Sequence, residues 1–169
     1  MKLRSRTSKC IAFLVTALAV AAALTGVAFA TTGSGAVGLI LARAAFTSPV
    51  DFKVKLADDP KVIHVPQAAD TVIQQITIQP GGYTGWHTHP GPAIALIKSG
   101  ELTLYSGDDP TCTGQSFGVG QAFVDSGQGH VHIARNLTSQ VTEVWVTYLD
   151  VPPGGSVRND APNPGNCTF

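Results

Sequence analysis

Short runs of alternating hydrophobic and polar residues are the main pattern in this chain once its first 30 residues are set aside. Alternation with a period of two places successive side chains on opposite faces of a strand, so each run predicts a half-buried β-strand. The runs are rich in β-branched and aromatic residues and cover residues 72–78, 93–98, 101–105, 131–134 and 141–149. Residues 38–46 and 51–56 carry a weaker form of the pattern and predict flanking strands.

Turn-forming residues separate these runs. Clusters rich in glycine, proline and aspartate lie between them, and Ser99-Gly100 stands directly between two runs, as in a tight hairpin. Many short strands, with no helical periodicity after the first 30 residues, predict an all-β domain, either an antiparallel sandwich or a barrel. Residues 152–166 are dense in Pro, Gly, Asn and Asp, and predict a surface tail without regular structure.

The first 30 residues have the pattern of a secretory signal peptide. Four basic residues precede an uncharged apolar run from Ile11 to Phe29, and small residues at its end are typical of a cleavage site. The alternative is an uncleaved anchor, because about 20 apolar residues can just span a bilayer. We therefore predict an exported protein with a signal peptide (1–30), a flexible leader (31–37), one domain (38–150) and a C-terminal tail (151–169).

Cleavage changes the charge balance. The whole chain has 11 basic and 11 acidic residues, and four of the basic ones lie in the predicted signal peptide, so the mature protein is mildly acidic. It has no basic cluster, which argues against a nucleic-acid-binding surface. The expected partner is a small-molecule ligand or substrate. Membrane contact is expected only through the N-terminal segment, and assembly into a homo-oligomer is left open.

Two cysteines, Cys112 and Cys167, remain after cleavage. An even number of cysteines in an exported chain suggests a disulfide, here between a loop-like segment and the tail. Such a bridge would close a loop of about 56 residues and stabilise the fold by about 2–4 kcal/mol in the chain-entropy account. The alternative is two unrelated thiols.

Two histidines separated by one residue, His87 and His89, are the main candidates for chemistry, and His132 follows far downstream. In an extended strand, residues i and i+2 project from the same face, so two imidazoles at this spacing can converge on one point. The pair therefore forms half of a metal site. The alternative is a pair of exposed or hydrogen-bonded histidines at the start of a strand. His130 is interpreted as a surface histidine. The alternative interpretation is that it is another ligand or a partner behind the ligands.

Two motifs in this chain resemble those of the cupin superfamily. The residues that carry the resemblance are Gly81, His87, His89 and Gly100 in the first motif, and Gly129, His132 and Asn136 in the second. The proline of the second motif has no counterpart here. The resemblance implies a double-stranded β-helix, that is, a jelly-roll barrel whose interior holds the site. It also implies that His87, His89 and His132 bind one divalent transition-metal ion.

The chain departs from the first cupin motif at its glutamate. Ala93 or Ile94 stands at that position, and neither side chain can bind a metal. Three imidazoles still suit Fe, Mn, Zn, Cu or Ni and leave positions open for water or substrate. Without the carboxylate the centre carries one more positive charge, which favours an anionic ligand and weakens the hold on the metal. Glu143 is an alternative carboxylate if its face of the strand points inward, whereas Glu101 is expected to be solvated.

Two classes of function follow from these residues. An exported mononuclear metalloenzyme, dioxygenase-like or hydrolytic, would use the three-histidine ion to bind a small anionic or oxygen-rich substrate. A cupin that binds a small ligand without turnover accounts equally for the absent glutamate and for the lack of an evident general acid or base near the motifs. A structural barrel with a vestigial metal site is a third reading. The fold alone does not choose between them, and no catalytic residue is predicted.

Overall fold

The computed structural model describes residues 30–56 and 61–169. Residues 1–29 of the predicted signal peptide, with Cys10, lie outside the described residues. None of the described residues forms a helix long and apolar enough to cross a membrane. The strands are β1 (Ser34–Ala45), β2 (Phe52–Lys55), β3 (Val62–Val65), β4 (Asp70–Tyr83), β5 (His87–Thr88), β6 (Ala93–Ser99), β7 (Glu101–Ser106), β8 (Gln115–Gly118), β9 (Ala122–Asp125), β10 (His132–Arg135), β11 (Thr142–Val151) and β12 (Asn159–Asp160).

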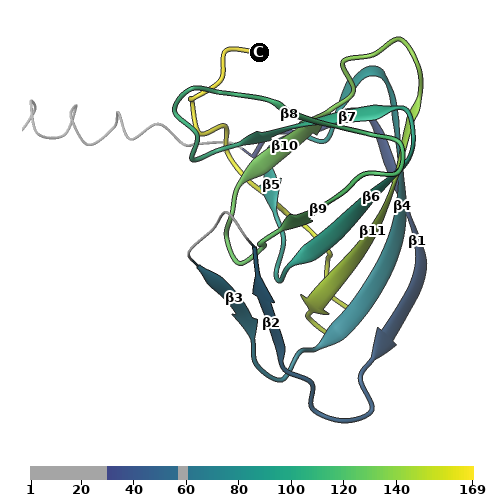
Figure 1. Cartoon of the computed structure of the whole chain (residues 1–169), viewed down its shortest axis with the longest axis vertical. Helices are drawn as coiled ribbons and strands as arrows, with labels where there is room; N and C mark the ends of the chain where they lie inside the picture. The colour runs from purple at the N-terminus through teal and green to yellow at the C-terminus, as the bar shows by residue number, and fades with distance from the viewer. Residues whose placement is uncertain (1–29, 57–60) are drawn as a thin grey trace, which may run out of the picture.

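The strands form two antiparallel layers that face each other across one core (Figure 1). One layer has the order β1-β4-β11-β6-β9, and the other has the order β8-β7-β10-β5-β12. The layers are continuous where the end of β4 meets β10, at the pair Tyr83 and Arg135. A separate two-stranded antiparallel sheet of β2 and β3 flanks the barrel. The all-β jelly-roll barrel predicted from the sequence is confirmed.

Alternation of side chains explains how the core is filled. In β6 and β11 every second residue is buried while its neighbours are more exposed, as expected for strands with one face toward a core. The core residues include Val72, Ile78, Ala95, Ile97, Leu102, Ala134, Val144, Val146 and Tyr148. Burial of a Val, Leu or Ile side chain contributes about 1.5–3 kcal/mol, so this shared core holds the two layers together.

The predicted hairpin at Ser99-Gly100 is wrong. Strand β6 pairs with β11 and β9, whereas β7 pairs with β10 and β8, so the chain crosses from one layer to the other at this point. Gly100 has a φ of 73°, and a Cβ there would lie 2.7 Å from both the carbonyl oxygen of Val141 and Oγ1 of Thr142. The glycine therefore permits a tight crossing between the two layers. A Ser-Gly pair is compatible with such a crossing as well as with a hairpin turn.

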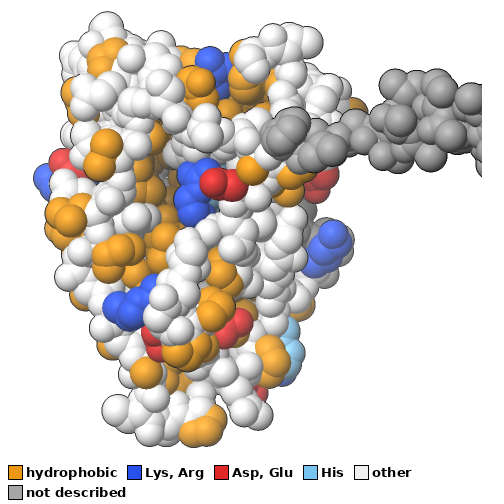
Figure 2. All heavy atoms as spheres, turned by 180° about the vertical axis from the view of Figure 1, so that it is seen from behind, with side chains coloured by type: hydrophobic (Ala, Val, Ile, Leu, Met, Phe, Trp, Pro, Cys, Tyr) orange, Lys and Arg blue, Asp and Glu red, His pale blue; other side chains and the backbone are white. Residues whose placement is uncertain are grey.

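The two ends of the described chain are more regular than predicted. Strand β1 begins at Ser34, inside the predicted flexible leader, and its apolar residues are exposed, with Val37 at 71% and Leu39 at 60% of full exposure. The view from behind shows many hydrophobic side chains on the surface and few charged ones (Figure 2). The prediction that residues 152–166 lack regular structure is wrong, because β12 pairs with β5 and Val157 and Ala161 are buried. The predicted domain boundaries themselves stay a prediction.

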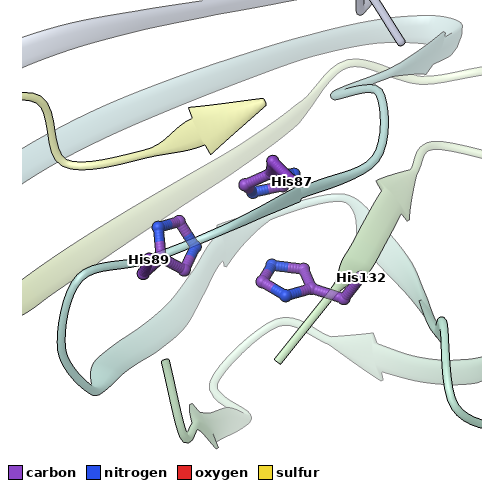
Figure 3. Close-up of side chains that lie close together, drawn as sticks. All are labelled: His87, His89 and His132. Atoms are coloured by element: carbon purple, nitrogen blue, oxygen red, sulfur yellow. The ribbon is translucent and has the colours of Figure 1, made fainter. Parts of the chain in front are cut away.

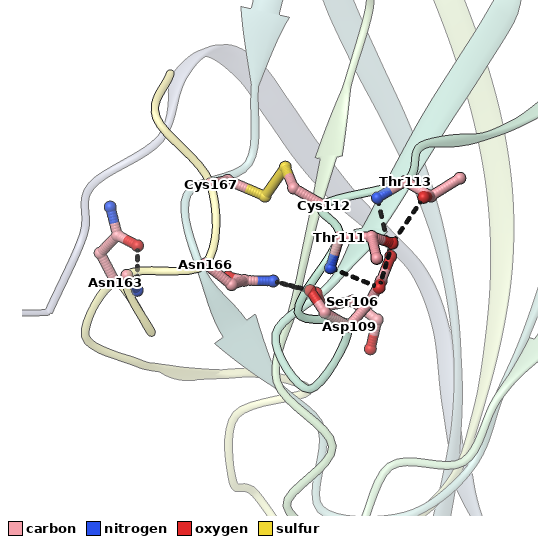
Figure 4. Close-up of a disulfide and its surroundings, with 9 residues drawn as sticks. Ser106, Asp109, Thr111, Cys112, Thr113, Asn163, Asn166 and Cys167 are labelled. Atoms are coloured by element: carbon pink, nitrogen blue, oxygen red, sulfur yellow. Dashed lines mark hydrogen bonds between the residues drawn. A yellow bond between two sulfur atoms is a disulfide. The ribbon is translucent and has the colours of Figure 1, made fainter.

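The disulfide between Cys112 and Cys167 is present and ties the tail to the loop after β7 (Figure 4). Asp109 shapes that loop, because its carboxylate accepts hydrogen bonds from the backbone N–H groups of Thr111 and Thr113, at 2.9 and 2.7 Å. On the tail side, Nδ2 of Asn166 donates to the carbonyl oxygen of Asp109 at 2.6 Å. The bridge therefore joins two segments that hydrogen bonds already hold in place.

Loss of this disulfide should destabilise the barrel. We expect the variant C112A/C167A to lose about 2–4 kcal/mol of unfolding free energy, because the bridge closes a long loop in the unfolded chain. Urea denaturation of the variant and of the wild type, with and without reductant, measures the change. Reduced wild type should match the variant, and equal stability of the oxidised wild type and the variant would contradict the expectation.

Candidate metal centre

Strand pairing brings the three predicted histidines together. His87 begins β5 and pairs directly with His132, the first residue of β10, while His89 follows β5 in the same extended segment. Gly85 allows the turn before β5, since its φ is 74° and a Cβ there would lie 2.4 Å from the carbonyl oxygen of Thr31. The three rings point toward one another inside the barrel (Figure 3).

The rings are close and shielded from solvent. Their centroids are 4.3 Å apart for His87 and His132, 4.9 Å for His87 and His89, and 5.1 Å for His89 and His132. One nitrogen from each lies within 4.8 Å of the other two, so a single ion could be held between them. The residues are only 4–6% exposed. The structure thus assembles the predicted ligand set, and metal binding by it stays a prediction.

Backbone carbonyls fix which ring nitrogen faces the centre. Nδ1 of His87 is 2.9 Å from the carbonyl oxygen of Gly85, and Nδ1 of His89 is 2.7 Å from that of Val157. A carbonyl oxygen can only accept, so each Nδ1 carries the proton and donates it. The Nε2 atom of both rings is then left with a free lone pair, which is the donor atom that a metal ion requires.

Burial keeps His87 and His89 neutral. Burial, together with the nearby His132, lowers the pKa of His87 to about 2 and that of His89 to about 4. Neutral imidazole is the form that binds a metal, so no proton has to be displaced from these rings at neutral pH. The donor set therefore fits a divalent transition-metal ion by its chemistry as well as by its placement.

A carboxylate that the sequence did not reveal lies beside His132. Asp125 ends β9 and is directly opposite Ala93 in the β6–β9 pairing, and Ala93 is one of the two residues at the position of the missing glutamate. Its Oδ2 is 3.2 Å from Nδ1 of His132, although that buried nitrogen does not have the alignment of a hydrogen bond. Asp125 thus places a negative charge on the outer side of the His132 ring. It does so from the strand opposite Ala93, where the cupin motif would have its glutamate.

His130 is the second partner of Asp125. Its Nδ1 is 2.6 Å from Oδ2 of Asp125, and its Nε2 is 2.7 Å from Oγ of Ser106. Burial opposes ionisation of Asp125, but the hydrogen bond with His130 and the close rings of His130 and His132 outweigh it and hold the pKa of Asp125 well below its usual range. The same hydrogen bond raises the pKa of His130. His130 is therefore a half-buried partner behind the ligands, and its interpretation as a surface histidine is wrong.

Neither predicted glutamate reaches the centre. Glu143 lies on the outer face of β11, where its Oε1 accepts hydrogen bonds from Nε2 of Gln75 at 3.0 Å and Nε1 of Trp145 at 2.7 Å. The alternative in which Glu143 points into the barrel is wrong, because the inward face of β11 carries Val144 and Val146. Glu101 is exposed, as predicted.

The three rings line one end of a small cavity. Its volume is about 50 Å³, enough for a few water molecules or for a ligand of a few non-hydrogen atoms. Most of the lining is aliphatic and comes from β4, β6, β7 and β11, with Thr84, Asp125 and Tyr148 as the other polar groups. The hydroxyl of Tyr148 donates to Oε1 of Gln74 at 2.9 Å, and burial raises the pKa of Tyr148.

Comparison with known proteins identifies similar folds. Neither a protein-family model nor a curated protein matches this sequence. Similar solved structures include the polyketide cyclase RemF from Streptomyces resistomycificus, with 22% identity over 53% of this chain and 59% of that chain, and a TM-score of 0.44. An oxalate oxidase has 21% identity over 47% of this chain and 41% of that chain, with a TM-score of 0.42. The Cupin_2 domain of an XRE-family transcriptional regulator from Enterobacter cloacae has 15% identity over 70% of this chain and 99% of that domain, with a TM-score of 0.43.

These likenesses concern the fold. The similar structures include cupin-domain proteins. The two histidine motifs of this chain resemble those of the same superfamily. The chain spans 59% of the length of RemF and 41% of that of the oxalate oxidase. Ligands and reactions of those proteins are therefore theirs, and the chemistry of this chain has to be argued from its own residues.

The neutral histidines should make the metal-free protein sensitive to mild acid. In the unfolded chain both rings take up protons near pH 6.5, but in the folded state they do so only near pH 4 and pH 2. Their contribution to stability is full above pH 6.5 and is lost as the pH falls below it. We expect these two rings to cost about 4 kcal/mol of stability between pH 7 and pH 5 by proton linkage.

Urea denaturation in the presence of a chelator, at pH 7, 6 and 5, measures this loss. The variant H87Q/H89Q should show a much flatter dependence. H64Q, which changes an exposed histidine of β3, should keep the slope of the wild type. Equal slopes for the wild type and H87Q/H89Q would contradict the linkage.

Proposed function

We propose that this protein is an exported cupin-type protein that binds one divalent transition-metal ion through His87, His89 and His132. The observation that carries the proposal is the preparation of the three rings before any ion arrives. They are buried, two have depressed pKa values, and those two have their Nδ1 protons bound to backbone carbonyls. Such outer contacts fix the tautomer and the ring orientation in metal sites.

The bound ion would take a small anionic ligand inside the barrel. A metal held by three neutral imidazoles keeps its full charge and open positions, at which it can polarise a bound oxygen group. The cavity beside the rings is lined mainly by aliphatic side chains, so it adds shape and low dielectric rather than further charges. Its volume of about 50 Å³ limits the ligand to a few non-hydrogen atoms.

Asp125 would act as a positioning residue for His132. The geometry supports this role, because Oδ2 lies 3.2 Å from the outer nitrogen of the His132 ring while the His130 bond and the N–H of Gly127, at 2.8 Å from Oδ1, hold the carboxylate in place. A carboxylate behind a ligand histidine increases the basicity of the ring that faces the metal. A glutamate ligand would have placed a negative charge directly on the metal. Asp125 would instead place that charge behind the His132 ring.

Ligand binding without turnover is the version of this function that the cavity favours. Besides the three histidines, the ionisable side chains at its wall are Asp125 and Tyr148. Asp125 is held by contacts with Gly127, His130 and His132. Tyr148 is neutral, and its hydroxyl donates a hydrogen bond to Gln74. Neither is free to accept a proton from a bound ligand. An enzymatic role would have to rely on the open positions of the ion alone.

Export accounts for the chemistry of the cysteines. A disulfide such as Cys112–Cys167 persists in oxidising compartments and is rare in reducing ones. Mass determination of the secreted protein tests this part, since cleavage after Ala30 gives a chain that starts at Thr31.

Metal content tests the central claim. Protein purified without an affinity tag of histidines should contain about one equivalent of a divalent transition metal by elemental analysis, and H87A/H132A should contain close to none. H64A is a matched control that should keep the metal, because His64 is an exposed residue of β3 and belongs to neither group of possible ligands. Addition of azide to the cobalt-loaded protein should shift its visible absorption, which reports an anion on the ion. Equal metal content in the wild type and H87A/H132A would overturn the proposal.

The role of Asp125 gives a separate expectation. D125N should keep the fold but bind the metal about 10–100-fold more weakly, because the amide removes the charge behind His132. Competition with a chelator measures the affinity, and thermal unfolding checks the fold. D51N, which removes a charge at an exposed loop position, should bind as the wild type does. An affinity of D125N equal to that of D51N would show that the carboxylate does not act on the centre.

A further inference from the structure

A second and larger cavity lies on the outer side of the strands that carry the histidines. Its volume is about 460 Å³, and its wall includes Thr31, Tyr83, Trp86, Ile133, Arg135 and Phe169. Alternation along the chain separates the two cavities. Trp86 is next to His87 and Ile133 is next to His132, so neighbouring side chains face opposite sides of the same backbone. This outer cavity contains none of the candidate metal ligands.

Arg135 is the unusual residue of the outer cavity. Its Nε is buried and has no hydrogen-bond partner, and within residues 30–56 and 61–169 no carboxylate forms an ion pair with it. An arginine has five N–H donors in one plane, and a buried donor without an acceptor costs about 1–3 kcal/mol. The side chain is thus prepared for an acceptor that the described chain does not provide.

Aromatic rings hold the guanidinium group in place. Its Cζ lies 3.9 Å from the ring centroid of Phe169 and 6.0 Å from that of Tyr83. Stacking covers the flat face of the group and leaves the N–H donors at its edge. A planar fork of donors with one face covered is suited to an acceptor that approaches in the plane, as a carboxylate does.

The aromatic wall is anchored to the barrel. Phe169 follows the Cys112–Cys167 disulfide by two residues, and its ring packs edge-on against Tyr105 with centroids 4.8 Å apart. Asn166, three residues before Phe169, donates hydrogen bonds to the carbonyl oxygens of Ser106 and Asp109. The end of the chain is therefore held over Arg135 by a covalent bond and by packing.

We propose that the outer cavity is a binding site for a small organic monocarboxylate with a flat, apolar body, and that Arg135 binds the carboxylate. One guanidinium matches one negative charge, and no other Lys or Arg is among the described residues that line this cavity. A phosphate dianion would lack a second cation. The rings of Tyr83, Trp86 and Phe169 provide the apolar surface, and the hydroxyl of Thr31 and the amide of Asn163 are the polar groups at its edge. This proposal does not rest on the metal centre.

Benzoate is the simplest probe of this chemistry, and benzamide is its neutral match. The protein is produced from its full coding sequence and treated with a chelator, so that benzoate cannot bind a metal ion. The substitution W145F leaves Trp86 as the one tryptophan in the chain, so that its fluorescence reports on the cavity. We expect benzoate to change the Trp86 signal with a Kd in the millimolar range, as for other ligands of this size, and benzamide to bind roughly tenfold more weakly or not at all.

Variants assign the carboxylate contact. R135Q should weaken benzoate binding by roughly tenfold or more, and R135K should fall between R135Q and the wild type, because lysine keeps the charge without the planar fork. K98Q removes a positive charge outside the cavity and should bind as the wild type does. H87A/H132A should also bind normally, which separates this site from the metal centre. Thermal unfolding confirms that each variant is folded.

Three results would overturn the proposal. Unchanged benzoate affinity in R135Q would show that Arg135 is not the contact, and loss of binding in H87A/H132A would place the anion at the histidines instead. Benzoate binding that appears in F169A but not in the wild type would show that the Phe169 side chain, rather than a ligand, fills the site beside Arg135.

Discussion

The pairing of β10 with β5 is the contact on which both sites of this molecule depend. It places His132 directly opposite His87, so the histidines of two distant motifs meet at one register position. A shift of β10 by one residue would turn that strand over relative to β5, because side chains alternate between its faces. His132 would then face outward and Ile133 inward, and the three histidines would no longer meet. The flanking pairs of β10 with β7 and of β10 with Tyr83 prevent such a shift.

The sequence was sufficient to predict the barrel where alternation is strong. Strands β4, β6, β7 and β11 fall close to the predicted runs because each buries one full face against the core. The short strands were missed for physical reasons. Strand β5 has two residues, and β9 has four in a segment framed by glycines, so neither is long enough to show a period. The error at Ser99-Gly100 arose because a turn signal does not say which layer the next strand joins.

The candidate site was predictable only in part for a related reason. Spacing along the chain was enough to suggest His87 and His89, since two residues in one strand share a face. Asp125 could not be found in this way, because its relation to the site arises from the pairing of β9 with β6. The position opposite Ala93 becomes visible only once that register is known. The role of His130 as a partner behind the histidines was only the alternative interpretation for the same reason, since its own partner is Asp125.

The tail contributes to the centre more than its composition suggests. The carbonyl oxygen of Val157 fixes the His89 ring, and β12 pairs with β5, where Asp160 lies opposite His87. Arg158 also donates to the carbonyl oxygen of Thr84, at 2.9 Å, in the turn that leads to β5. These contacts set an order of events during biosynthesis. The histidines at positions 87, 89 and 132 leave the ribosome before residues 157–160, so the growing chain at first holds three imidazoles without the contacts that orient them. The rings of His87 and His89 can reach their folded orientation only after residues 157–160 have been made and have folded back onto the barrel.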